Sequence, residues 1–172
     1  MTQNDSKAKY VARIGLMTAA LEAAKLALSP IPNIELVSFF IILFTLYFGR
    51  KVLFAIPIFI IIEVMIYGFN PLWVIAYCYV WPLLYFMSKA LKKGESSFAP
   101  ALLSGLFGLL FGFLCSFPYL FITTSMNPTA SLSSAIAWWV AGIPFDIIHG
   151  VSNFIIMLVL YKPVSRVLDR MN

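Results

Sequence analysis

The chain has 172 residues, of which 62% are hydrophobic and only 11% are charged, and its mean hydropathy is +0.93. A composition this apolar excludes an ordinary soluble domain and indicates an integral membrane protein. The formal net charge of +5 does not indicate nucleic-acid binding, because the basic residues lie between apolar stretches, where membrane proteins carry them.

Six apolar stretches follow one another along the chain and predict an all-α membrane bundle of six transmembrane helices. A bilayer core of about 30 Å needs about 20 residues of helix. Pro30 and Pro32 predict a stiff external turn after the first helix. No second domain is visible, so residues 1–172 are expected to form one membrane domain. We expect the helices at residues 11–28, 34–48, 52–69, 71–91, 99–122 and 135–160.

The basic residues predict the direction of each crossing. Eleven of the 12 Lys and Arg side chains fall in four segments, and the alternate connections at 29–33, 69–71 and 123–134 carry none. Cytoplasmic loops retain positive charge, so the sequence predicts that these four segments and both termini are cytoplasmic. The basic residues of the four segments are Lys7, Lys9, Arg13, Arg50, Lys51, Lys89, Lys92, Lys93, Lys162, Arg166 and Arg170.

The exception is Lys25, which lies within the first apolar stretch. At roughly 100° per residue it shares a polar helix face with Thr18, Glu22 and Ser29. A charge inside a membrane helix faces protein or water. We therefore expect this face to look into the bundle, with Glu22 and Lys25 paired at i,i+3. The pair is either an internal staple or part of a ligand site.

The opposite side of the first helix carries small alanine side chains. Small residues let membrane helices approach one another closely. This side therefore either packs within the bundle or forms a docking surface for another membrane subunit. A row of small residues on the fifth helix, Ser104, Gly108 and Gly112, predicts a second close approach. The candidate docking residues on the first helix are Ala20, Ala23, Ala24 and Ala27.

A second polar stripe lies on the sixth helix and includes Asp146 and His149. An Asp and a His three residues apart are consistent with a hydrogen-bonded structural pair, the wall of a binding cavity, or a proton or metal pair. Two ligands without a third make a poor metal site, so no metal is expected. Other polar and aromatic groups near the outer side predict an outward-facing pocket. The residues predicted to bind substrate are Glu35, Glu63, Tyr67, Asn70, Trp139, Asp146 and His149.

Motifs for catalysis are missing from the sequence. It contains no GxSxG elbow, no HExxH and no phosphate-binding glycine loop. We therefore expect a protein that is not an enzyme and carries no cofactor. It also has no Walker sequence, so the chain itself is not expected to use ATP.

The whole chain resembles the substrate-binding S component of an energy-coupling-factor (ECF) vitamin transporter. The resemblance rests on six helices, a length of 172 residues, cytoplasmic termini and the alanine-rich string LMTAALEAAKLAL. The AxxxA signature of that family matches Ala20 and Ala24, with Ala19 and Ala23 as an alternative register. It implies that the alanine face docks on a transmembrane coupling subunit, the T component, which is bound to two ATPase subunits. It also implies the cell membrane of a prokaryote as the location.

Two strings are similar to a cobalamin-specific subgroup of that family, IPNIELVSFFIILFTLYFGRK and WWVAGIPFDIIHGVSNF. The resemblance implies a receptor that captures a vitamin, expected to be cobalamin, at the outer face. It would release the vitamin inward by toppling on the coupling module. The alternatives are a smaller ligand, such as pantothenate or a pyrimidine precursor, or a polytopic membrane enzyme or assembly factor that uses Asp146 and His149.

Overall fold

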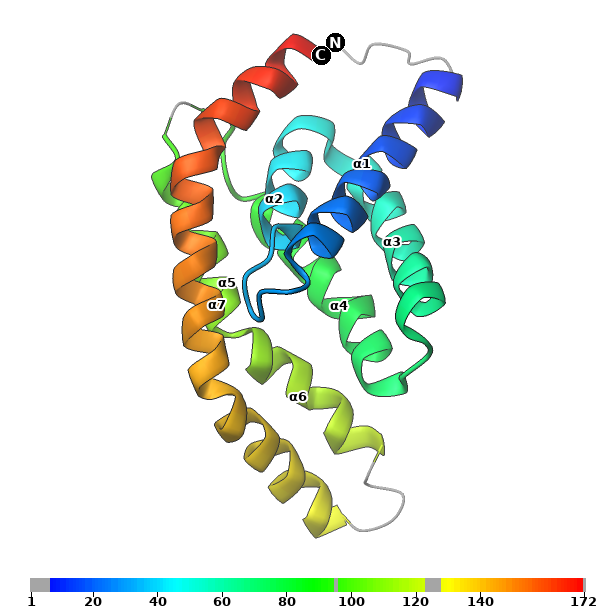
Figure 1. Cartoon of the computed structure of the whole chain (residues 1–172), viewed down its shortest axis with the longest axis vertical. Helices are drawn as coiled ribbons and strands as arrows, with labels where there is room; N and C mark the ends of the chain where they lie inside the picture. The colour runs from blue at the N-terminus through cyan, green and yellow to red at the C-terminus, as the bar shows by residue number, and fades with distance from the viewer. Residues whose placement is uncertain (1–6, 95, 123–127, 172) are drawn as a thin grey trace.

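The computed structural model describes residues 7–94, 96–122 and 128–171, and within these ranges the chain is helical and contains no strand (Figure 1). The predicted all-α class is confirmed for this part of the chain. The elements are α1 (Lys7–Leu28), α2 (Val37–Phe48), the 3₁₀ turn η1 (Gly49–Lys51), α3 (Val52–Tyr67), α4 (Pro71–Ser88), α5 (Phe98–Leu109), α6 (Phe111–Ile122) and α7 (Pro128–Met171).

α1 begins and α7 ends at the same end of the bundle (Figure 1). Contacts at that end join the four basic segments of the sequence. Lys51 Nζ lies 5.6 Å from the centre of the Tyr10 ring, and Lys93 Nζ lies 2.6 Å from Asp169 Oδ1. The segments that the sequence predicts to lie on one side of a membrane therefore share one end of the fold, here called the basic end.

Within the described ranges, three helical segments are long and apolar enough to cross a membrane, judged by length and composition. They are Pro71–Ser88, Phe98–Leu120 and Leu132–Arg170. By contrast, α2 has 12 residues and α3 has 16. At about 1.5 Å per residue both are shorter than a bilayer core of about 30 Å. Membrane-helix character is thus borne out for three segments, where the sequence predicted six spans.

The core of the bundle is centred on α2. Eight of its 12 residues are buried, and Ile41, Ile42 and Leu43 expose no surface. α2 packs against α1, α3, α4, α5 and α7. A helix that is apolar on all sides belongs in the interior of a larger bundle. Its neighbours therefore cover α2 over its whole short length.

The predicted fifth helix is two helices, because the chain breaks between α5 and α6 at Leu110. The Leu110 N–H donates to the Leu106 carbonyl at 3.1 Å and closes the last turn of α5. The Gly112 N–H is one of the unpaired donors in the first turn of α6. It donates instead to Asp146 Oδ1 of α7 at 3.0 Å. The prediction of one continuous helix over 99–122 was therefore wrong. The Asp146 side chain of α7 accepts the hydrogen bond that a helical carbonyl would otherwise accept from Gly112.

α7 is longer than the sequence predicted. Residues 123–134 were expected to form a loop, but α7 begins at Pro128. Proline suits the first position of a helix, where no N–H is needed. Residues 123–127 lie outside the described part of the chain. The helix also continues through Pro163 to Met171, and its 44 residues make it about 66 Å long, which exceeds a bilayer core.

α5 lies unusually close to α7. A Cβ atom on Gly108 would lie 2.8 Å from Gly150 Cα and 3.0 Å from the carbonyl carbon of His149, so only glycine fits there. A Cβ on Gly105 would lie 2.9 Å from Phe154 Cβ. The close approach predicted for the row Ser104, Gly108 and Gly112 is therefore borne out at Gly108, and Gly105, outside that row, shares the contact. This contact, formed by Gly105, Gly108 and Gly150, is here called the glycine seam.

Candidate binding cavity

Three neighbouring hollows lie away from the basic end, and the connection 29–36 lines the first two of them. Their volumes are about 300, 380 and 250 Å³. The first and second share Lys25, Asn33 and Glu35, and Tyr77 lines all three. Helices α1, α3, α4, α6 and α7 supply most of the walls. The three hollows together are here called the central cavity.

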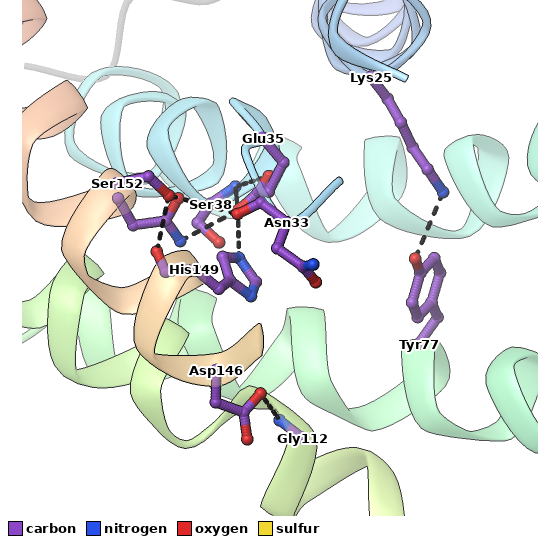
Figure 2. A network of polar contacts seen from close by, with 10 residues as sticks. Lys25, Asn33, Glu35, Ser38, Tyr77, Gly112, Asp146, His149 and Ser152 are labelled. Carbon is purple, nitrogen blue, oxygen red and sulfur yellow. Dashed lines mark hydrogen bonds and ion pairs between the residues drawn. The ribbon is translucent and has the colours of Figure 1, made fainter. Parts of the chain in front are cut away.

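Glu35 holds the connection against α7 (Figure 2). Its carboxylate accepts from the Ser38 N–H at 2.9 Å and from Asn153 Nδ2 at 3.2 Å, and it lies 3.1 Å from His149 Nε2. Ser38 is in the first turn of α2, where a negative charge is favoured by the helix dipole. The carboxylate therefore has hydrogen-bonding partners on both α2 and α7.

Asn33 makes a second contact between the connection and α7. Ser152 Oγ donates to the Asn33 carbonyl at 3.3 Å and to the His149 carbonyl at 3.0 Å (Figure 2). Asn33 has a φ of 61°, a left-handed conformation that asparagine adopts more readily than most residues. The connection is thus pinned to α7 at two positions, Asn33 and Glu35.

Lys25 extends from the last turn of α1 into the cavity. Its ammonium group pairs with the Glu63 carboxylate of α3 and lies 3.3 Å from the Tyr77 hydroxyl (Figure 2). It also lies 5.0 Å from the centre of the Tyr77 ring and 5.4 Å from that of Tyr67, within the range of cation–π attraction. Lys25 therefore joins α1, α3 and α4 around the cavity.

The polar face of α1 looks into the bundle, as the sequence predicted. Thr18 is 3% exposed and Glu22 is 8% exposed, whereas Ser29 lies exposed after the helix end. The predicted pairing of Glu22 with Lys25 is an electrostatic interaction without a hydrogen bond. Both Glu22 carboxylate oxygens are buried without a hydrogen bond, because the long Lys25 side chain reaches across to Glu63 instead.

Asp146 and His149 are both buried, but they bind different partners. Asp146 Oδ1 accepts the Gly112 N–H, and its Oδ2 is buried without a hydrogen bond. His149 lies against Glu35 and, at 4.9 Å between ring centres, against Phe111. The hydrogen-bonded Asp–His pair considered from the sequence is therefore replaced by two contacts, each of which ties α7 to another element.

Six of the seven predicted site residues line the central cavity. Glu35, Asp146 and His149 line the first hollow, and Glu63 and Tyr67 line the second together with Glu35. Asn70 lines the third hollow, where its Oδ1 also accepts the Leu72 N–H and caps α4. The seventh, Trp139, packs on Phe113 at 5.2 Å between ring centres, and its neighbour Trp138 lines the first and third hollows.

An aromatic row on α4 forms a wall that sequence reasoning missed. The ring centres of Trp73 and Tyr77 lie 5.3 Å apart, as do those of Tyr77 and Trp81, and Trp81 lies 5.5 Å from Phe111 of α6. Residues four apart share one helix face. The spacing of three aromatic residues at i, i+4 and i+8 was the signal that could have identified this wall.

The alanine face of α1 is only partly exposed. Ala19, Ala23 and Ala27 are exposed, Ala20 is half-buried and Ala24 is 8% exposed. α1 packs against α2 and α3, and this packing covers Ala24. The surface that is open to another helix therefore includes Ala19 and Ala23, the alternative AxxxA register.

Within the described residues, no three His, Cys, Asp or Glu side chains gather in a way that could hold a metal ion. Comparisons of the chain with models of known protein families, with curated proteins and with solved structures found no match.

Proposed function

We propose that this chain is the substrate-binding S component of an ECF-type vitamin transporter in the cell membrane of a prokaryote. The observation that carries the proposal is the central cavity, over which the connection 29–36 is pinned to α7. Aromatic walls with a few convergent polar groups are the usual form of a small-molecule site. In this role the chain binds a vitamin without transforming it, and the partner subunits hydrolyse ATP.

The proposed topology has six crossings, with both termini and the basic end in the cytoplasm. The short α2 fits within it because non-helical backbone is tolerated at membrane depth where protein covers it. Cysteine labelling tests the orientation in a background without Cys78 and Cys115. A Ser29→Cys variant should react with an impermeant reagent from outside, and a Ser96→Cys variant only after permeabilisation; both positions are exposed. The opposite accessibility would reject the orientation.

The size of the hollows bears on the ligand. Each is suited to a molecule of the size of pantothenate or a pyrimidine precursor. Cobalamin, which the resemblance implies, fits only if the three hollows merge. Tyr77 lines all three hollows, so movement of its side chain is the step that would join them.

Calorimetric titration of the purified protein against cobalamin, pantothenate and a pyrimidine precursor distinguishes these ligands. Tight binding of one vitamin, recovered unchanged, supports the receptor, whereas a chemically altered product indicates the enzyme alternative. Trp138→Ala should weaken binding by about tenfold, because the exposed Trp138 ring lines two of the hollows and a bound ligand would cover it. Trp139→Ala is the matched control, because Trp139 does not line the cavity. Equal effects of both substitutions would place the ligand elsewhere.

The exposed small residues of α1 are the proposed docking surface for the T component. Leucine at Ala19 and Ala23 would add bulk to that surface and prevent close helix approach. The Ala19→Leu/Ala23→Leu variant should bind the vitamin normally but fail to co-purify with the coupling subunits. Ala137→Leu/Ala141→Leu is the control, because this pair has the same spacing and is exposed on α7. Wild-type assembly of the α1 variant would reject this surface.

A further inference from the structure

A separate hollow lies at the basic end, where α2, the segment after α4 and the last turns of α7 meet. Its volume is about 550 Å³, and it is lined by Tyr47, Lys93, Lys162, Arg166 and other residues. It shares no lining residue with the central cavity. Nothing in the vitamin-binding role accounts for this hollow, here called the basic hollow.

The walls of the basic hollow are fixed by contacts between three segments. Tyr161 donates from its hydroxyl to the Gly94 carbonyl at 3.1 Å. Lys93 pairs with Asp169 at 2.6 Å and lies 4.0 Å from the centre of the Tyr47 ring, and Tyr47 donates to Asp169 at 3.2 Å. The hollow is therefore a built feature and its shape does not depend on one flexible side chain.

Positive charge is in excess in the basic hollow. Three cations, Lys93, Lys162 and Arg166, line it with one carboxylate, Asp169, which leaves a net charge of +2. Asp169 already accepts from Lys93 and Tyr47. Among the residues that the structure describes, no ion-pair partner is found for Lys162 or Arg166. They are one helical turn apart, so they repel each other unless an anion lies between them.

The basic hollow also contains a hydroxyl group, which is a hydrogen-bond donor. Ser165 lines the hollow, is 7% exposed, and its Oγ makes no hydrogen bond. It lies near the Tyr47 hydroxyl but outside hydrogen-bonding geometry. A buried hydroxyl without a partner is costly. Protein atoms cover the Ser165 Oγ, so a ligand with acceptor oxygens would reach it only once the side chain rotates towards the hollow.

The position of the basic hollow along α7 indicates which kind of anion binds there. Lys162 is the first charged residue after Asp146, so the apolar part of α7 ends at the hollow. A phosphate group suits the guanidinium and ammonium donors, since arginine binds phosphate oxygens in a bidentate manner. Basic clusters at the end of a membrane helix attract anionic phospholipids. We propose that the basic hollow binds the phosphate-bearing headgroup of an anionic phospholipid. The proposal requires only that α7 crosses a membrane, whatever the central cavity binds.

Native mass spectrometry of the purified protein in mixed micelles tests the site. The wild-type protein should retain one phosphatidylglycerol in preference to phosphatidylcholine. Lys162→Gln/Arg166→Gln should weaken that binding by about 30-fold, from the usual contribution of two basic residues at a membrane surface. Lys89→Gln/Lys92→Gln removes the same charge from exposed positions outside the hollow and should retain the lipid.

The outcomes separate the site from its alternatives. Equal retention by wild-type protein and the Lys162→Gln/Arg166→Gln variant overturns the proposal, and so does an equal loss in the control variant, which would indicate general charge attraction. Displacement of the lipid by inorganic phosphate at a similar concentration would assign the hollow to free phosphate and reject the lipid. Thermal unfolding without lipid should be the same for all three proteins, because the four replaced side chains are exposed.

Discussion

Replacing Lys25 by methionine tests how the central cavity holds its charges. The Glu63 side chain is 1% exposed, whereas that of Lys25 is 26% exposed. Glu63 Oε1 makes no hydrogen bond, and its Oε2 pairs with Lys25. Lys25→Met therefore leaves a buried carboxylate without its cation. Breaking a buried pair from one side typically costs about 3–5 kcal/mol, and we expect a loss of stability in this range.

The reverse substitution should cost less. In Glu63→Gln, the Lys25 ammonium keeps its contact with the Tyr77 hydroxyl at 3.3 Å, its aromatic neighbours and its access to solvent. We expect a loss of about 1.5–3 kcal/mol, the usual contribution of a hydrogen bond to a charged group. The double variant removes both charges together. It should be more stable than the sum of the two single losses predicts, by about 0.5–3 kcal/mol.

The assay is unfolding of the four proteins in one detergent, followed by circular dichroism with temperature and with denaturant. Lys89→Met serves as the control, since Lys89 is exposed and lies away from the cavity. Equal, additive losses from Lys25→Met and Glu63→Gln would show that the two charges do not stabilise each other. The asymmetry argued from their burial would then be wrong.

Three further predictions concern packing and hydrogen bonding. Gly108→Ala should lower the free energy of unfolding in detergent by about 1–3 kcal/mol, because its Cβ would meet the α7 backbone. Gly15→Ala, with open space around it, should leave this free energy unchanged or raise it by up to about 1 kcal/mol. A stabilised Gly108→Ala variant would refute the close approach of α5 to α7. Asp146→Ala should lower the free energy of unfolding by about 0.5–2 kcal/mol and speed amide hydrogen exchange in the first turn of α6. Unchanged exchange in that turn would show that Asp146 does not cap this helix. Glu35→Ala should speed amide exchange in the connection 29–36 while α5 stays protected, since the carboxylate ties the connection to His149; uniform exchange in both proteins would contradict this.

Local features of the sequence were enough to predict the all-helical class and the inward polar face of α1. Apolar stretches and the small-residue row depend on residues close in the chain, so they can be read without knowing the fold. The buried positions of Thr18 and Glu22 and the tight contact at Gly108 follow from such patterns. Glu35 and Glu63, which the sequence grouped in one predicted pocket, line the same hollow near the helix ends away from the basic end.

The misses depend on partners distant in the sequence. Lys25 meets Glu63, which is 38 positions away, and nothing on α1 identifies that partner. The break between α5 and α6 is stabilised by Asp146, 34 positions from Gly112, within a stretch that is apolar throughout. The start of α7 was missed for a different reason. Its first residues are polar and resemble a loop, whereas Pro128 suits the first position of a helix.

α7 runs from the central cavity to the basic hollow, and the glycine seam lies between them. Trp138 and Asp146 lie on one side of Gly150, in the wall of the central cavity, and Arg166 lies on the other side, in the wall of the basic hollow. Arg166 is about 24 Å along the helix from Gly150. The central cavity and the basic hollow therefore share one helix although they share no lining residue, so a displacement of α7 at one hollow has a direct covalent path to the other.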